Sequence, residues 1–286
     1  MQQILAQSLP LVALAFLASA MFSVGLDLTT RQIVDPLKNR RLVGAALVGN
    51  LVLVPLIALA IARLFPIDPA LAIGIVVYAL AAGTEGGPKF VQLAKGNAGF
   101  AVGLLAVLLS VTVVCMPMAL SLAVPDAHID RGSLLVKLFM AVVVPIGAGL
   151  SIRAARPGMA DRLSAFMHRA VLVLLALFFV QVIVVNYAAM LALQPAALLG
   201  AALYFAAAFA VGYVLGGPRT ENRRALAIMT FVRNAPIAMT TASQVFAHEP
   251  RVLVMVTVMA AMSVVLGVLA VVGFNRMQTQ QAAVAD

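Results

Sequence analysis

The sequence predicts an all-α protein that crosses a lipid bilayer several times, and three observations lead to this fold class. Of the 286 residues, 64% are hydrophobic and only 10% are charged, whereas soluble domains carry about 25% charged residues. The hydrophobic residues form repeated runs that are long enough for transmembrane helices. They do not alternate with polar residues, as the strands of a membrane β-barrel would.

The apolar runs divide the chain into about nine membrane-spanning segments, which we expect to form one transmembrane unit over residues 1–286. Short polar loops join the segments, and no soluble domain is expected. The third and eighth segments are interrupted by proline and charged residues, and the third also by glycines. In chain order, the predicted segments are 4–28, 42–65, 69–95, 97–123, 132–152, 163–187, 194–217, 222–247 and 251–275.

The first segment must be distinguished from a signal peptide, because Ala18-Ser19-Ala20 resembles a cleavage site. Signal peptides begin with basic residues, but no lysine or arginine precedes Arg31. We therefore expect residues 4–28 to remain as a membrane-spanning helix.

The net charge of +9 is explained by membrane topology and not by nucleic-acid binding, because the basic residues gather in alternate loops. Loops rich in lysine and arginine stay in the cytoplasm. This rule predicts a multi-pass protein of the cell membrane (inner or plasma membrane) with its amino terminus outside and its carboxyl terminus in the cytoplasm. The predicted cytoplasmic side holds Arg31, Lys38, Arg40, Arg41, Lys95, Arg153, Arg156, Arg162, Arg169, Arg219, Arg223, Arg224 and Arg276, and the outer loops hold Arg63, Arg131 and Arg251.

A glycine-rich stretch, Ala81–Lys89, interrupts the third segment. The apolar run before it, 70–82, would be about 20 Å long as a helix, whereas a bilayer core is about 30 Å thick. The segment must therefore continue beyond the break to cross the membrane. Non-helical backbone at this depth is tolerated only where protein or a water-filled cavity surrounds it.

A second break, Met229–Pro236, interrupts the eighth segment, which is predicted to run in the opposite direction to the third. Two broken helices at corresponding positions are typical of inverted repeats in transporters. We expect segments 2–4 to correspond to segments 7–9, and segment 1 to segment 6. Segment 5 then has no counterpart.

Both breaks combine a proline with a cation. Pro88 and Pro236 suit the first turn of a new half-helix, whose free N–H groups carry partial positive charge. Lys89 and Arg233 stand beside these helix ends, and charges inside a membrane are costly and usually functional. This combination favours an anion site. In the alternative interpretation, Lys89 pairs with Glu85, Arg233 bonds to free carbonyl groups, and both only stabilise the breaks.

No other motif predicts a metal site, a cofactor or enzymatic chemistry. Cys115 lies in an apolar run and is expected to fill the core. His128, His168 and His248 fall in or near predicted loops, too scattered for a metal site or a catalytic triad, and are expected to be solvated. A membrane enzyme would need paired acids or a nucleophile and a base inside the segments, where Glu85 is the only deeply placed acid.

Several short segments resemble, in order, motifs of the bile acid:sodium symporter family. Together they extend over most of the chain, and the two breaks lie where the family has its own. The matching segments are MFSVGLDL at 21–28 (MFGMGLTL in the family), NLVLVPL at 50–56 (QFTIMPL), LAKGN at 93–97 (LAKGD), VVVPIGAG at 142–149 (LLPVLLG) and RNAPIA at 233–238 (QNSGLA).

This resemblance implies both an architecture and an activity. The implied panel subdomain consists of segments 4–28, 132–152 and 163–187. The implied core subdomain consists of 42–123 and 194–275, and the two broken helices cross within it. The implied activity is transport of organic anions by alternating access.

The chain departs from the family at the sodium sites. Sodium-coupled members have a glutamate where this chain has Met229, and a glutamine where it has Arg233. The family's Ser-Asn pair aligns with Gly87-Pro88, while Asn50 keeps a polar group where members carry glutamine. Sodium requires oxygen ligands, so the comparison implies that a fixed cation stands where members bind sodium.

The leading hypothesis is a sodium-independent secondary transporter of a small organic anion, a carboxylate, with Glu85 as a candidate proton carrier. Alternatives are a carrier without a coupling ion, a sodium-coupled symporter for bile acid-like or other organic anions with rebuilt sites, and a receptor or sensor in which Lys89 binds an aldehyde. Expected partners are the anion, the lipid bilayer and protons, without cofactor or nucleic acid. The candidate substrate-binding residues are Asn50, Thr84, Glu85, Gly86, Gly87, Pro88, Lys89, Thr230, Arg233, Asn234 and Pro236.

Overall fold

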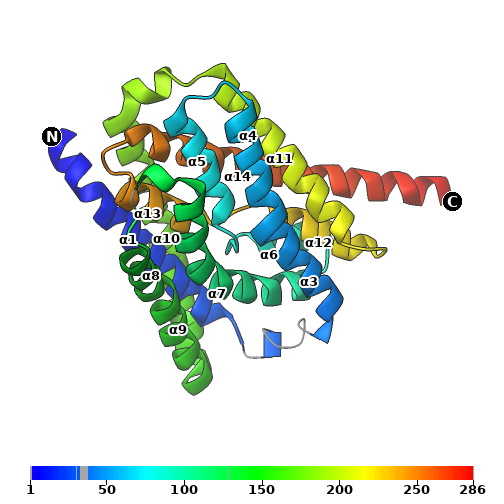
Figure 1. The fold of residues 1–286 in the computed structure, drawn as a ribbon. Helices are drawn as coiled ribbons and strands as arrows, with labels where there is room; N and C mark the ends of the chain where they lie inside the picture. The colour runs from blue at the N-terminus through cyan, green and yellow to red at the C-terminus, as the bar shows by residue number, and fades with distance from the viewer. Residues whose placement is uncertain (1, 30, 33–37, 128, 286) are drawn as a thin grey trace.

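In the computed structural model, the described part of the chain (residues 2–29, 31–32, 38–127 and 129–285) consists of helices and their connections, without a β-strand. The helices form one bundle (Figure 1). In chain order they are α1 (Gln2–Asp27), α3 (Arg40–Val48), η2 (Gly49–Leu53), α4 (Val54–Leu64), α5 (Pro69–Leu80), α6 (Gly87–Leu93), α7 (Ala98–Ala123), η3 (Pro125–Ala127), α8 (Arg131–Leu138), η4 (Phe139–Val143), α9 (Val144–Ala155), α10 (Pro157–Leu191), α11 (Pro195–Leu215), α12 (Thr220–Phe231), α13 (Ala235–Val245) and α14 (Pro250–Ala285).

Long apolar helices confirm the predicted fold class, an all-α polytopic membrane protein. Within the described ranges, seven helical stretches are long and apolar enough to cross a membrane: Gln7–Asp27, Arg40–Leu64, Ala98–Ala123, Arg131–Ala155, Pro157–Leu191, Pro195–Leu215 and Pro250–Met277. The predicted third and eighth segments each consist of two short helices. The count of nine crossings therefore stays a prediction.

Two of the long helices contain a π-helical turn just before a proline. The turn η2 precedes Pro55 and the turn η4 precedes Pro145. A proline ring clashes with the carbonyl group four residues earlier and has no N–H to donate, and the wider π turn makes room for it. Asn50 lies within η2 and is fully buried.

The two predicted breaks are present. Helix α5 ends at Leu80 and α6 begins at Gly87, while α12 ends at Phe231 and α13 begins at Ala235. Pro88 and Pro236 lie in the first turns of α6 and α13, as predicted. Gly83 has a φ of 85°, which only glycine adopts at little cost.

The broken helices cross, and hydrogen bonds join the two breaks. The backbone N–H of Asn234 donates to the carbonyl oxygen of Ala81 at 2.8 Å, and its Nδ2 donates to the carbonyl oxygen of Gly83 at 2.7 Å. From α7, Thr112 Oγ1 donates to the carbonyl oxygen of Ala82 at 3.2 Å. These three carbonyl groups of the linker after α5 are thereby paired, as buried backbone groups must be.

The helices pack in two groups. Helix α1 packs against α9 and α10, whereas α5 packs against α4 and α14, and α11 against α4 and α12. Figure 1 shows α1, α8 and α9 on one side and α4, α11 and α12 on the other. Gly149 lets α9 approach α1 closely, since a Cβ there would lie 2.6 Å from the carbonyl oxygen of Phe22. These groups resemble the expected panel and core, whose boundaries stay a prediction.

The expectation that Cys115 fills the core is wrong. Its side chain is exposed on the surface of α7, next to the exposed Val114. A residue in an apolar run faces lipid as readily as core, so the apolar run alone did not indicate which face of the helix Cys115 occupies.

Candidate functional site

A cavity of about 1000 Å³ lies between the two groups of helices. One wall consists of α1, the residues that follow it, and α10. The other consists of the first break, α6 and α7. Its apolar lining residues include Ala20, Val24, Leu28, Val102, Leu105 and Val171, and its polar ones are Ser23, Asp27, Arg31, Gln32, Glu85, Lys89, Gln92 and His168. The cavity therefore suits a molecule with an apolar body and a charged group.

Part of the predicted site lines this cavity: Glu85, Gly86, Pro88 and Lys89. Lys89 is exposed, and its Nζ donates to Gln92 Oε1 at 3.2 Å. Glu85 is half-buried, with Asn234 Nδ2 at 3.5 Å from its Oε2. The alternative in which Lys89 pairs with Glu85 is not observed, because Lys89 donates to the uncharged Gln92 instead.

A second part of the predicted site lies in the protein interior, around Arg233. Its side chain is only 1% exposed. Its Nε donates to the Tyr204 hydroxyl oxygen at 3.0 Å, and its Nη1 donates to Asn50 Oδ1 at 3.1 Å and to the Asn50 carbonyl oxygen at 3.3 Å. Asn50 Nδ2 in turn donates to Thr230 Oγ1 at 3.3 Å. We call Asn50, Tyr204, Thr230 and Arg233 the buried arginine cluster.

The buried arginine cluster is separate from the cavity, because none of its residues lines it. In this structure, Arg233 therefore cannot directly contact a ligand bound in the cavity. Arg233 Nη2 has no hydrogen-bond partner. The structure brings Arg233 together with Asn50 and Thr230, but not with Lys89, and an effect of the Arg233 charge on a bound anion stays a prediction.

Asn234 connects the two breaks. Its Oδ1 accepts a hydrogen bond from the N–H of Ile237 at 2.9 Å and so caps α13, while its Nδ2 reaches the first break. Thr84, Gly87 and Pro236 are also buried at the crossing. A Cβ on Gly87 would lie 2.5 Å from the sulfur of Met229. These residues shape the crossing and do not line the cavity.

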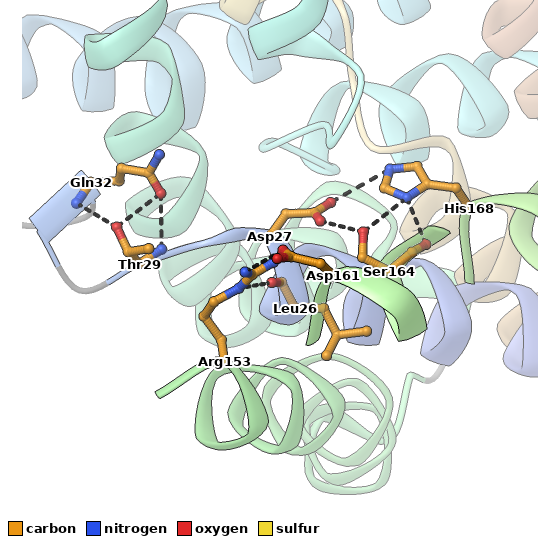
Figure 2. A network of polar contacts seen from close by, with 8 residues as sticks. All are labelled: Leu26, Asp27, Thr29, Gln32, Arg153, Asp161, Ser164 and His168. Atoms are coloured by element: carbon orange, nitrogen blue, oxygen red, sulfur yellow. Dashed lines mark hydrogen bonds and ion pairs between the residues drawn. The ribbon is translucent and has the colours of Figure 1, made fainter. Parts of the chain in front are cut away.

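A polar network that the sequence did not predict lies where α1 ends (Figure 2). Ser164 Oγ donates to Asp27 Oδ1 at 2.6 Å. His168 Nδ1 lies 2.9 Å from the Ser164 carbonyl oxygen and 3.2 Å from Ser164 Oγ. His168 Nε2 lies 3.5 Å from Asp27 Oδ2. The expectation that His168 lies in or near a loop is wrong, because it lies within α10. The expectation that it is solvated is confirmed, because its side chain is exposed. His128 lies outside the described residues.

The same network holds α9 and α10 against the end of α1. Arg153 Nη1 forms an ion pair with Asp161 Oδ1 at 2.6 Å, and Arg153 Nε donates to the carbonyl oxygen of Leu26. The backbone N–H of Thr29 donates to Gln32 Oε1 at 2.9 Å. This wall of the cavity is therefore held in part by polar contacts.

Two signals in the sequence point to the missed residues. Asp27 is an acid at the end of an apolar run, just before a basic loop, and Ser164 and His168 lie four residues apart, which places them on one face of a helix. Tyr204 has no comparable signal, because its segment is apolar throughout.

Residues 14–215 match the model of the sodium bile acid symporter family, which is well over half of the chain. The protein belongs to this family. Membership implies a multi-pass secondary transporter of bile acids or related organic anions, and it confirms the resemblance found in the sequence. The match ends before α12, so Met229 and Arg233 lie outside it. No curated protein is significantly similar to this family member.

Proposed function

We propose that this protein carries a small organic anion with a carboxylate group across the cell membrane by alternating access, without sodium. The observation that carries the proposal is the cavity, which combines apolar walls with Lys89 beside the first break. An ammonium group in a partly dehydrated cavity attracts a carboxylate, and the apolar walls bind the remainder of the molecule. Bile acid-like amphipaths, 2-oxo acids and pantoate-like acids all have this character.

The contacts around the cavity support alternating access. The cavity extends to the exposed Arg31 and Gln32 after α1. Further toward the amino end of α1, α13 packs against it, and Thr240 Oγ1 donates to the carbonyl oxygen of Ala13 at 3.1 Å. With the predicted topology, the open end is cytoplasmic and the closed end faces outside. Opening the outer end requires the α1–α13 contact to separate.

Sodium independence is supported by the chemistry of the second break. The buried Met229 offers only a thioether, and the Arg233 guanidinium donates hydrogen bonds to oxygen atoms of Asn50 and Tyr204. These oxygens are therefore already paired with a permanent cation. Glu85, the acid of the first break, lines the cavity and remains the candidate proton carrier. A carrier without any coupling ion is the alternative that the same contacts allow.

A ligand screen on the purified protein tests this proposal. Cholate, 2-oxoisovalerate, pantoate and acetate are added in choline chloride, each beside its uncharged amide, and the melting temperature is measured. We expect at least one carboxylate to stabilise the protein, because a ligand bound only by the folded state adds stability by mass action, and its amide to have no such effect. Uptake of that carboxylate into proteoliposomes then tests transport. Equal shifts for a carboxylate and its amide would contradict an anion site.

A further inference from the structure

The guanidinium group of Arg233 has hydrogen-bond donors that the buried arginine cluster does not use. A guanidinium carries N–H groups on all three nitrogens and has no acceptor. Nε donates to the Tyr204 hydroxyl oxygen, and Nη1 donates to both oxygen atoms of Asn50. Nη2 is buried and has no hydrogen-bond partner among the described residues. Because Nη2 lies on the same edge of the planar guanidinium as Nε, its N–H groups are next to Tyr204.

The hydroxyl group of Tyr78 lies beside this arginine and is also without a partner. Tyr78 belongs to α5 and is fully buried. Its ring packs edge-on against the ring of Tyr204, with the centroids 6.3 Å apart. Its hydroxyl group lies close to the backbone of Arg233 and to Ser263 of α14, but neither contact has the geometry of a hydrogen bond. Over the described ranges, no acceptor receives the hydroxyl hydrogen of Tyr204 either.

The positive charge of Arg233 has no acid beside it. Arg233 forms no ion pair with any acid that the structure describes. Arginine stays charged in proteins, and this side chain is almost completely buried. The rings of Tyr78, Tyr204 and Phe205 pack edge to face against one another on this side of the bundle. An unpaired charge is costly in such an apolar environment, and an opposite charge in contact with it lowers that cost.

We propose that the buried arginine cluster binds a chloride ion, held by Arg233 Nη2 and by the hydroxyl groups of Tyr78 and Tyr204. Chloride is a single atom that accepts several hydrogen bonds at once, and it balances the charge of the guanidinium. A water molecule would bring further hydrogens to a place with unused donors, and it would leave the charge unbalanced. The site is distinct from the cavity, because neither Arg233 nor the two tyrosines line it.

The chloride ion connects parts of the chain that the direct contacts leave apart. Tyr78 belongs to α5, which leads into the first break, while Arg233 lies in the second break and Tyr204 belongs to α11. Bound chloride therefore adds a link between the two broken helices beside the one that Asn234 makes. This role does not depend on which anion the cavity carries, or on whether the protein is a transporter.

Binding of radioactive chloride to the purified protein tests the site directly. The protein is prepared in choline methanesulfonate, whose anion is much larger than a single atom. We expect saturable binding of a single chloride ion per chain, displaced by bromide but not by further methanesulfonate. The melting temperature should rise as chloride replaces methanesulfonate, because a ligand of the folded state adds stability by mass action. Absence of saturable binding would overturn the proposal.

Matched variants locate the ion. Tyr78→Phe removes one donor and keeps the ring, so we expect chloride to bind about tenfold more weakly. Tyr213→Phe is the control, because Tyr213 belongs to the same helix as Tyr204 but not to the cluster, and it should bind chloride as the wild type does. Folded Arg233→Met should bind none. Wild-type binding by Tyr78→Phe would overturn the proposed site, as would loss of binding in Lys89→Met, which would place the chloride in the cavity.

Discussion

The two breaks contain similar residues but lie in opposite environments. Lys89 at the first break is exposed and lines the cavity, whereas Arg233 at the second is almost completely buried and lies away from it. The difference follows from the order of cation and proline. Lys89 follows Pro88 and is part of helix α6, while Arg233 precedes Pro236 and lies in the linker between α12 and α13. Lys89 lies on a helical turn and is exposed, whereas Arg233 lies in a linker where its neighbours enclose it.

This comparison assigns different roles to the two cations. Lys89 has one neutral side-chain partner, Gln92, and is free to attract a ligand. Arg233 bonds to residues of η2 and α11 and so joins three parts of the bundle. These contacts favour a stabilising role for Arg233 and leave Lys89 as the candidate to attract an anion, and both roles stay predictions. Substitutions at the two positions should separate stability from binding.

The largest expected effect is loss of stability in Arg233→Met. The variant removes three hydrogen bonds and leaves Asn50 and Tyr204 oxygens buried without this donor, at about 1 kcal/mol for each bond. Loss of a buried charge offsets part of this cost, so we expect a decrease of about 2 kcal/mol in the free energy of unfolding, measured by denaturant titration. Lys89→Met, the matched substitution at the exposed break, should change it by less than about 0.5 kcal/mol. Equal values for the two variants would contradict the comparison.

The next effect concerns Asn234, the residue that joins the breaks. Asn234→Ala removes the cap of α13, worth about 1 kcal/mol, and also the bond to the Gly83 carbonyl oxygen. Asn39→Ala is the control, because Asn39 caps α3 without a bond to a break. We expect Asn234→Ala to lower the melting temperature more than Asn39→Ala does. The reverse order would mean that the bond between the breaks contributes little.

A smaller effect is expected on binding at the exposed break. Lys89→Met should raise the dissociation constant of the carboxylate that binds about tenfold, which corresponds to about 1.4 kcal/mol, without loss of stability. Lys95→Met removes the same charge from a lysine just after α6 that does not line the cavity. Titration calorimetry should give a wild-type affinity for this control. A loss of affinity in both variants would indicate a general effect of net charge.

The sequence predicts the helices and both breaks because these depend on local chemistry. The length of apolar runs, Pro88, Pro236 and the glycines near residue 85 determine where helices begin and end. The same local information cannot say that Arg233 turns toward Asn50 and Tyr204, since these residues come from distant elements. The orientation of a side chain at a crossing depends on the packing of all the helices around it.

The site was predicted in part for the same reason. The sequence indicates that residues 84–89 lie at a break, and the structure places four of them on the cavity. It does not indicate the opposite wall, where Asp27 and His168 come from α1 and α10. That wall forms only when two helices separated by more than a hundred residues pack side by side.

The smallest expected effect is that of sodium, because the buried break already contains a cation. A sodium ion needs several oxygen ligands at once. At the second break the oxygens of Asn50 and Tyr204 accept hydrogen bonds from Arg233, and the buried Met229 offers only a sulfur. A bound ion would also lie close to the guanidinium, and two like charges in the interior repel strongly.

Replacing choline by sodium should therefore leave the melting temperature of the wild type unchanged. A ligand bound only by the folded state would add about 2.7 kcal/mol at a concentration about one hundred times its dissociation constant, so even weak binding is measurable in this way. Potassium in place of sodium controls for ionic strength. A rise specific to sodium would show that other oxygens of the protein form a cation site, and the sodium-coupled alternative would then replace the present proposal. If sodium leaves the wild type unchanged and Arg233→Met is unstable, the guanidinium of Arg233, and not a bound sodium ion, supplies the positive charge that stabilises this crossing.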